Sequence, residues 1–372
     1  MNIKKTGITL LVFLLLTPLM SHAQKISLYN QTGEAVAYIV DDDMKIYLSK
    51  GDCVAYLDDQ SIYGINGKHL GWFKDGIIWD HEGCLVGYIE GVYNNGVFNK
   101  VAVFESLKGR KVQPFLKSCQ GPQPIEPVYK SQWATQSMEK LFFLGPQWAR
   151  DAVYLVPNYL VVNNVWDAQV SNGEQCINFP FRQSFSWNWN WRDKKTGAPV
   201  SYPSVIFGDK PWDGLNSTTT LLPCPMSSVK QLYVAHDYAL HADGKYNVAY
   251  NLWLTDGPLS SMETIRVEIM VWIESAGEIQ PFGFPGYLVE DTESYTLYKH
   301  RRIEDRKSWD CYSFKMKRAR RSALVDLGKL LQNLIHKQGI SPDFYLSDVE
   351  FGTEIWDGQG QMDLKFYQVL IL

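Results

Sequence analysis

The sequence predicts a mostly β protein, in which a C-terminal β-jelly-roll sandwich with one packed helix follows a small N-terminal module of four β-hairpins. Three patterns predict this fold. An aromatic and glycine motif recurs four times near the N-terminus, short alternating runs separated by Gly, Pro, Asn and Asp fill the C-terminal part, and one segment carries apolar residues at helical spacing. Repeated hairpins and short alternating strands are typical of β architectures.

The first 23 residues are predicted to be a secretory signal peptide. Two lysines near the start precede an apolar run over 8–20, and Ser21-His22-Ala23 forms a small-x-small cleavage pattern. The apolar run is too short to span a bilayer comfortably, and no cysteine follows the cleavage pattern to accept lipid. We therefore expect a secreted or periplasmic protein without a membrane span or a lipid anchor.

Residues 25–92 are predicted to form the four-hairpin module. Each unit combines a strand, a glycine-containing turn and a second strand, which is the chemistry of a β-hairpin. No unit can bury an apolar face alone, so the four should pack around a common axis. The module resembles the four-fold β-flower modules of bacterial exported proteins; a folding or spacing unit is favoured over a carbohydrate or protein contact, and its aromatics are expected mainly in the core. The repeated motif, aromatic-x3-Gly-x4-aromatic, fits Tyr29-Gly33-Tyr38, Tyr47-Gly51-Tyr56, Tyr63-Gly67-Trp72 and Trp79-Gly83-Tyr88.

Residues 93–149 are interpreted as a linker with short local structure, because Pro and Gly interrupt any long element there. The jelly roll is expected over 150–372. Its single helix is predicted over 322–338, with Gly339 as the stop, and should pack an apolar stripe on the outer face of the sandwich. The stripe comprises Leu324, Leu327, Leu330, Leu331, Leu334 and Ile335.

Charge and cysteine content exclude several classes of function. A net charge of −4 argues against a nucleic-acid partner, and the basic run 315–321 is interpreted as a solvated approach to the predicted helix. Six cysteines lie in the exported part, where disulfides persist, and allow fifteen full pairings; a free buried cysteine remains the alternative for any of them. No CxxC pair or HxxxH arrangement occurs, so a zinc site is not expected. We expect no other metal and no organic cofactor.

Two glutamates, Glu268 and Glu354, stand in apolar, strand-like runs where a charge is costly. Residues 265–273 alternate, with Ile and Val on one face, expected to be core, and polar or large residues on the other. Gly352 should leave a gap beside Glu354 in which a ligand could approach. Two carboxylates facing one cleft are the minimum for hydrolysis of a glycosidic bond. The residues expected to share a face with the glutamates are Arg266, Met270, Trp272, Glu350, Gly352 and Trp356.

Four stretches, in order, resemble the family-12 glycoside hydrolases, which are secreted endo-β-glucanases. The resemblance covers about residues 150–372. It is carried by Asn163-Asn164-Val165-Trp166, by Tyr202-Pro203-Ser204-Val205-Ile206-Phe207-Gly208 with Lys210-Pro211-Trp212, by Glu268-Ile269-Met270-Val271-Trp272 and by Gly352-Thr353-Glu354.

The resemblance implies that Glu268 is the nucleophile, that Glu354 is the acid/base and that Trp166 is a sugar-stacking platform. The chain departs from the family pattern at Asn251, where many members carry an Asp that partners the nucleophile. Asn can form hydrogen bonds but cannot ionise. Because a like charge raises a carboxylate's pKa, we expect this departure to alter the pH profile rather than abolish the chemistry.

Tryptophan and asparagine dominate the predicted cleft, as neutral sugars require. Asn164, Trp253, Trp272 and Trp356 are expected to bind substrate, with Asn251 and Met270 in support. The run Phe185–Trp191 puts three more tryptophans on one strand face, which could line the cleft or fill the space between two sheets. Arg266 is expected at the rim or paired with a carboxylate.

The resulting interpretation is a secreted, retaining endo-β-1,4-glucanase that hydrolyses internal bonds of a β-glucan or xyloglucan. Glu268 would form a covalent glycosyl-enzyme intermediate, and Glu354 would protonate the leaving group and then activate water. The alternative is a non-catalytic glucan-binding protein on the same fold, of which Asn251 would be the first sign. The sequence leaves open the preferred glucan, the role of the N-terminal module, the cysteine pairing and the oligomeric state.

Overall fold

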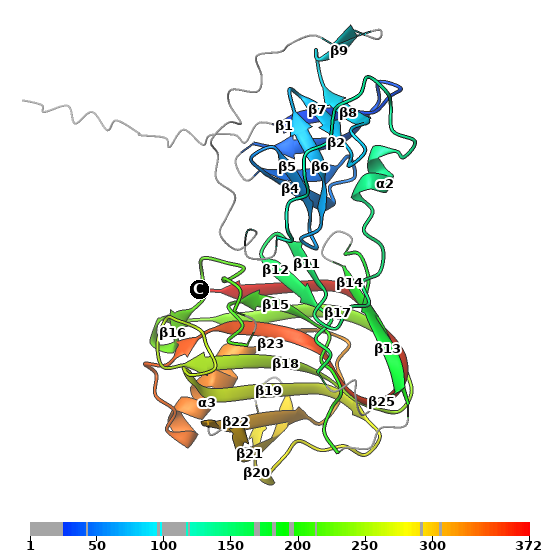
Figure 1. Cartoon of the computed structure of the whole chain (residues 1–372). Helices are drawn as coiled ribbons and strands as arrows, with labels where there is room; N and C mark the ends of the chain where they lie inside the picture. The colour runs from blue at the N-terminus through cyan, green and yellow to red at the C-terminus, as the bar shows by residue number, and fades with distance from the viewer. Residues whose placement is uncertain are drawn as a thin grey trace, which may run out of the picture.

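The computed structural model describes residues 25–41, 44–94, 97–98, 117, 120–166, 172–180, 184–192, 197–212, 214–290, 293–304 and 307–372. The predicted signal peptide lies outside the described residues. The described chain forms a small β module and a large β-sandwich, which lie one above the other in Figure 1. The predicted fold class is confirmed. No helix among the described residues is both long enough and apolar enough to cross a membrane.

The N-terminal module is a closed eight-stranded antiparallel barrel, which confirms the predicted four hairpins. Each strand pairs with the next, and pairing of the first strand with the last closes the ring. The strands are β1 (Lys25–Tyr29), β2 (Ala35–Val40), β3 (Lys45–Leu48), β4 (Cys53–Asp58), β5 (Ser61–Gly64), β6 (His69–Lys74), β7 (Ile77–Trp79) and β8 (Leu85–Ile89).

The eight motif aromatics form four cross-strand pairs around this ring. The aromatic that ends one repeat lies opposite the aromatic that begins the next, and Tyr88 of the last repeat pairs with Tyr29 of the first. Their neighbours in sequence, such as Leu28 and Ile46, are fully buried and fill the interior of the barrel. Because successive side chains of a strand point to opposite faces, the aromatic pairs lie on the outside of the barrel. Four of the eight, Tyr56, Tyr63, Trp72 and Tyr88, are nevertheless buried, so the expectation of core positions holds for half of them.

The barrel packs directly on the sandwich through one of these pairs. Tyr56 and Tyr63 join the sandwich core, and the backbone N–H of Leu155 donates to the carbonyl of Ile65 at 2.7 Å. The helix α2 (Met138–Phe142) covers another side of the barrel and buries Met138 in its core. Short strands β9 (Tyr93–Asn94) and β10 (Val97–Phe98) follow the barrel.

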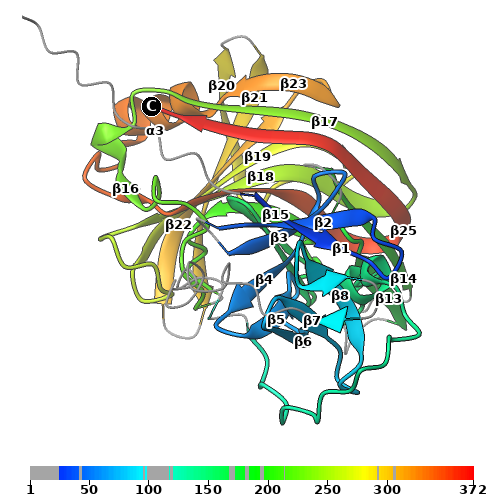
Figure 2. The ribbon, with the colours of Figure 1, turned by 90° about the horizontal axis from the view of Figure 1, so that it is seen from above.

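The sandwich consists of two sheets that share one long strand. In the first sheet the order is β11-β12-β15-β25-β18-β19-β22-β21-β20; the second contains β13, β14, β17 and β23. Figure 2 shows β25 curving along the sandwich. Its first half pairs with β15 and β18, and its second half pairs with β14 and β17.

The strand bounds follow, with the short helix η3. They are β11 (Val153–Val156), β12 (Tyr159–Val162), β13 (Asn172–Ile177), β14 (Phe185–Arg192), β15 (Ser204–Gly208), β16 (Cys224–Pro225), η3 (Met226–Ser228), β17 (Leu232–Ala242), β18 (Lys245–Thr255), β19 (Ile265–Ala276), β20 (Phe284–Glu290), β21 (Ser294–Glu304), β22 (Lys307–Met316), β23 (Ser322–Asp326), β24 (Tyr345–Leu346) and β25 (Asp348–Ile371).

The three tryptophans of β14 belong to the core. Trp187, Trp189 and Trp191 are buried between the sheets, whereas the Ser and Asn residues between them are half-buried on the opposite face. Of the two alternatives left open by the sequence, the core therefore holds for all three.

The predicted helix begins later than expected. Residues 322–326 form strand β23, which pairs with β17, and α3 spans Leu327–Gln338. Asp326 caps its N-terminus by accepting from the backbone N–H of Lys329, and Gly339 ends it with φ 69°. Leu324 is 67% exposed because it lies on the strand, so it does not belong to the helical stripe.

Among the described cysteines, Cys84, Cys176, Cys224 and Cys311 are free thiols. The alternative of a free buried cysteine therefore holds for Cys84, Cys176 and Cys311, whereas Cys224 is half-buried. Cys119 lies outside the described residues.

Candidate active site

A cleft of about 570 Å³ opens on the first sheet of the sandwich. Its floor comes from β18, β19 and β25, and one wall comes from β21 and β22. All nine residues predicted for catalysis or substrate binding line this cleft: Asn164, Trp166, Asn251, Trp253, Glu268, Met270, Trp272, Glu354 and Trp356.

The two glutamates enter the cleft from the strands that flank β18. Glu268 on β19 lies opposite Trp253, and Glu354 on β25 lies opposite Asn247. Both side chains therefore belong to the same concave face, as the alternation in the sequence predicts. The negative charge of Glu268 also helps to raise the pKa of Glu354, so the two carboxyl groups interact.

Glu268 is buried and receives two hydrogen bonds on the same oxygen. Trp309 Nε1 donates to Oε2 at 3.1 Å, and Cys311 Sγ donates to it at 3.3 Å. Both donors lie on β22, which runs parallel to β19 and places Cys311 directly beside Glu268. Charge-assisted bonds of this kind stabilise the ionised carboxylate.

Glu354 has a different environment. Burial raises its pKa to about 7, although Asn247 lowers it by donating from Nδ2 to Oε2 at 2.5 Å; Glu268 raises it and Arg302 lowers it. The side-chain oxygen Oδ1 of Asn247 also accepts from the Glu354 backbone N–H at 3.4 Å. A carboxyl group with a pKa near 7 can both give and take a proton at neutral pH.

Asn251 lies on β18, between β19 and β25, and lines the cleft floor. With its amide oriented to suit its neighbours, it donates to Ile269 O at 3.1 Å and accepts from Trp253 Nε1 at 3.2 Å. Met270 is its cross-strand partner on β19. Among the described residues, the hydrogen bonds to Glu268 thus come from β22, while Asn251 holds Trp253.

A buried ionic cluster forms a hydrogen bond with the indole of Trp253. Trp253 Nε1 donates to Glu350 Oε1 at 3.0 Å, and Lys210 Nζ binds Glu350 Oε2 at 2.8 Å. Burial and the charge of Glu350 raise the pKa of Asp348 well above its usual range, which favours its neutral form. Lys210 also lines the cleft, so this ion pair extends from the buried Glu350 to the cleft surface.

The motif that contains Tyr202 fills the space beside Gly352. A Cβ at Gly352 would lie 2.4 Å from Pro203 O and 2.8 Å from Tyr202 Cε2. The expectation that this glycine leaves room for a ligand is therefore wrong; it permits close packing of the neighbouring strand instead.

Trp166 is the most exposed tryptophan of the cleft, at 48%. Its Nε1 donates to Pro199 O at 2.9 Å, and Asn164 Nδ2 donates to Tyr202 O at 3.2 Å. These bonds fix the indole of Trp166 and the side-chain amide of Asn164. An indole that is held at one edge and half exposed is suited to stacking against a sugar ring.

Trp272 and Trp356 form a second aromatic surface, with ring centroids 6.2 Å apart. Trp356 Nε1 donates to Gly197 O, and the Lys315 ammonium lies 5.7 Å from the Trp272 ring centroid. The two rings pack across Ala249 of β18.

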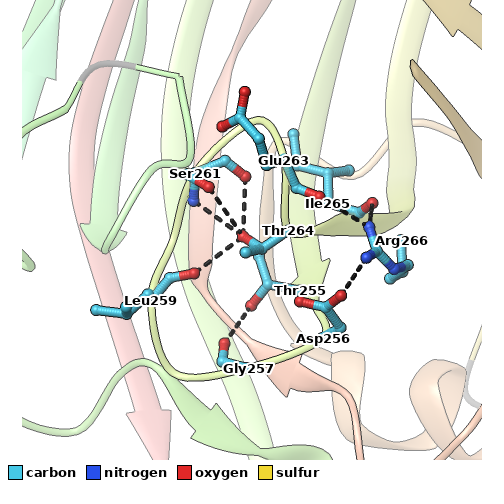
Figure 3. A network of polar contacts seen from close by, with 9 residues as sticks. All are labelled: Thr255, Asp256, Gly257, Leu259, Ser261, Glu263, Thr264, Ile265 and Arg266. Carbon is cyan, nitrogen blue, oxygen red and sulfur yellow. Dashed lines mark hydrogen bonds and ion pairs between the residues drawn. The ribbon is translucent and has the colours of Figure 1, made fainter. Parts of the chain in front are cut away.

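The loop between β18 and β19 is fixed by polar contacts where β19 begins (Figure 3). Thr264 Oγ1 donates to Leu259 O at 2.9 Å, and the Arg266 guanidinium donates to Glu263 O and pairs with Asp256. Arg266 is therefore the partner of a carboxylate, one of its two expected roles. A register shift where β18 ends also places Ile265 against Trp253 rather than in the main core, which corrects its expected face.

Several residues of the site escaped the sequence reasoning. Asn247 could have been found, because it shares the alternation of Asn251 and Trp253 on β18. The sequence carries no comparable signal for the residues of β21 and β22. They reach the cleft because β22 pairs in parallel with β19, a pairing between separate segments of the chain. The further lining residues include Tyr202, Lys210, Trp212, Phe282, His300, Arg302, Cys311 and Ser313. Among the described residues, no group of three or more His, Cys, Asp or Glu side chains could hold a metal ion.

The chain is similar to several known proteins. Its residues 26–142 match the family described as 4-fold beta flower protein. Endoglucanase S of Pectobacterium parmentieri is 28% identical over 59% of this chain and 84% of that protein. The structure of a family 12 xyloglucanase from Bacillus licheniformis has a TM-score of 0.57 and 27% identity, and covers 61% of this chain and 100% of that one. The Inactive glycoside hydrolase XLP1 of Phytophthora nicotianae is 23% identical over 57% of this chain and 86% of that protein.

The sandwich residues 157–370 match the sequence model of glycosyl hydrolase family 12, which spans more than half of the chain. The four motifs, the two-sheet sandwich and the carboxylate cleft all lie within or at the edge of this match. The chain therefore belongs to glycosyl hydrolase family 12 and is a glycoside hydrolase.

Proposed function

We propose that the protein is a secreted, retaining endo-β-1,4-glucanase that hydrolyses internal bonds of β-glucans or xyloglucan. The observation that carries the proposal is the pair of carboxyl groups in one tryptophan-lined cleft, of which Glu354 has a pKa of about 7 and Glu268 accepts two hydrogen bonds. The substrate class is supported by relatives that are named as endoglucanases and xyloglucanases.

In the proposed first step, Glu268 attacks the anomeric carbon while Glu354 gives its proton to the departing glycosidic oxygen. The bond between carbon and that oxygen breaks, and an ester to Glu268 forms. In the second step Glu354 takes a proton from water, the water oxygen bonds to the anomeric carbon, and the Glu268 carboxylate leaves. Burial prepares Glu354 for both tasks, because its pKa lies close to neutral pH.

The substrate would lie across the aromatic surfaces of the cleft. Trp166 is proposed to stack against one sugar ring, while Trp272 and Trp356 shape the floor next to the glutamates. The lining is mostly aromatic and amide-bearing, which suits a neutral chain of hydroxyl-rich sugars. Export is proposed from the pattern of residues 1–23.

The experiment that tests the proposal measures reducing-sugar release by the mature protein from mixed-linkage β-glucan, xyloglucan and carboxymethyl cellulose. Glu268→Gln is the matched control. Activity that disappears in the variant would support the hydrolase and identify the preferred glucan. Proton NMR of the first product should show the β-anomer before mutarotation, and the α-anomer would contradict retention.

A second candidate is a glucan-binding protein without turnover. The presence of Asn251 in place of the family's Asp favours it, and a relative is named as inactive. Binding of all three glucans without product release would select this alternative.

A further inference from the structure

Two donors from one strand converge on a single oxygen of Glu268. Trp309 Nε1 and Cys311 Sγ lie 3.1 Å and 3.3 Å from Oε2. The two residues occupy alternate positions on β22, so both side chains face the cleft side of the sheet. Both are almost fully buried, which strengthens their bonds to a charged oxygen.

The position of the Trp309 ring is fixed by its neighbours. Trp212 and Trp253 pack against it at centroid distances of 5.7 Å and 6.1 Å. Arg302 lies opposite it on β21, with the guanidinium carbon 5.7 Å from the ring centroid. A donor held in this way cannot follow Glu268 if the carboxylate rotates, so it selects one orientation of that carboxylate.

The Cys311 thiol is suited to donate and unsuited to compete as a nucleophile. Burial, the charge of Glu268 and the hydrogen bond to it raise the pKa of Cys311 far above its usual range. The group therefore stays protonated at neutral pH, and only the thiolate is a strong nucleophile.

We infer that Trp309 and Cys311 are positioning residues that hold Oε2 of Glu268 and favour its departure as a carboxylate in the second step of the reaction. The inference rests on the proposed nucleophilic role of Glu268. With both donors on Oε2, Oε1 is the oxygen that bonds to the anomeric carbon. In the ester intermediate Oε2 is a neutral carbonyl oxygen, and it regains negative charge as water displaces Glu268.

The two steps should respond differently to loss of the donors. Hydrogen bonds to a charged oxygen are about twice as strong as bonds to a neutral one. They consequently stabilise the second transition state relative to the ester. The first step starts and proceeds with charge on the carboxylate, so its rate should change less.

The test uses 2,4-dinitrophenyl β-cellotrioside, whose leaving group departs without protonation and makes the second step limiting. For Trp309→Phe we expect kcat to fall about 10-fold to 30-fold, from the loss of one bond to a charged group. KM should fall in parallel, so that kcat/KM stays within about threefold, and mass spectrometry should detect accumulated glycosyl-enzyme. For Cys311→Ala a smaller fall of about threefold to tenfold is expected, with Cys311→Ser restoring most of kcat because the hydroxyl can donate.

Matched controls remove the same groups elsewhere in the sandwich. Trp191→Phe deletes a buried indole donor that binds Gln175 Oε1, and Cys176→Ala deletes a buried free thiol on β13. Both controls should keep kcat and KM near the wild-type values. Thermal melting verifies folding of each variant, and the Ala and Ser variants at position 311 decide the question if Trp309→Phe does not fold.

Equal losses in kcat and kcat/KM without accumulated intermediate, or no change in any donor variant, would overturn the inference. A wild-type protein that neither turns over the aryl glycoside nor forms the intermediate would instead overturn the proposed function.

Discussion

The two glutamates of the cleft, one on each side of β18, have different hydrogen-bond partners. On the β19 and β22 side, Glu268 accepts an indole N–H and a thiol S–H on one oxygen. On the β25 side, Glu354 is held by Asn247 alone among the described hydrogen-bond donors, and burial raises its pKa to about 7. The contrast shows that neighbours, rather than residue type, give two glutamates of one cleft different environments, and the proposed mechanism assigns them different roles.

Arg302 reinforces the contrast. Burial alone would lower the pKa of Arg302. The pKa is nevertheless raised, and the charge of Glu268 contributes most to the rise. Arg302 also acts on Glu354 and lowers its pKa, but there the cost of burial is larger. One cation thus interacts with both carboxyl groups, and at Glu354 its effect is outweighed by burial.

The largest expected effect comes from exchanging each glutamate for Gln. Glu268→Gln should lose at least about 10⁴-fold of activity on every substrate, because an amide oxygen cannot form the ester. Glu354→Gln should lose about 10²-fold to 10⁴-fold on polysaccharide. On an aryl glycoside with a dinitrophenol leaving group its kcat/KM should recover, because the first step then needs no proton, whereas kcat should stay low because the second step still lacks its base. Steady-state kinetics on both substrates checks this, and equal rescue of the two variants would remove the difference in roles.

The repeat module and the cleft floor show what sequence alone could predict. The fourfold motif fixes hairpins because each glycine and aromatic recurs at the same spacing, so local chemistry determines the element. Alternation likewise placed Glu268, Met270 and Trp272 on one face of a strand, and the structure brings all nine predicted residues into one cleft.

The errors arose where a distant segment decides the outcome. The helical spacing of Leu324 and Leu327 is genuine, but residues 322–326 pair with β17, and a strand pairing overrides local periodicity. Gly352 looked open because its sequence neighbours do not show that Tyr202 and Pro203 pack there. Trp309 and Cys311 were not predicted as partners of Glu268 because the return of β22 beside β19 is a property of topology.

Glu350, a second glutamate on β25, tests how much a charged partner stabilises a buried carboxyl group. Glu350 is fully buried but is paired with Lys210 at 2.8 Å. Lys210→Met should destabilise the protein by about 3–5 kcal/mol, because it leaves a buried carboxylate without its cation. Thermal or denaturant unfolding measures the loss, and adding Glu350→Gln should recover part of it. Lys307→Met, which removes an exposed ion pair with Glu263, should leave the melting temperature near that of the wild type. A Lys210→Met protein as stable as the wild type would mean that the ion pair contributes nothing.

The smallest expected effect is a shift in pH dependence at Glu354. The first step needs Glu354 protonated, so with a pKa of about 7 the rate on polysaccharide should fall as pH rises through about 7. Asn247 donates to the ionised form and therefore lowers this pKa; in Asn247→Ala the pKa should rise, and the basic limb of kcat/KM should move to higher pH. Asn247→Asp should move the limb further in the same direction, because it removes the donor and adds a like charge. A limb that moves to lower pH in either variant, measured on xyloglucan or β-glucan across pH 5–9, would show that the basic limb does not report Glu354.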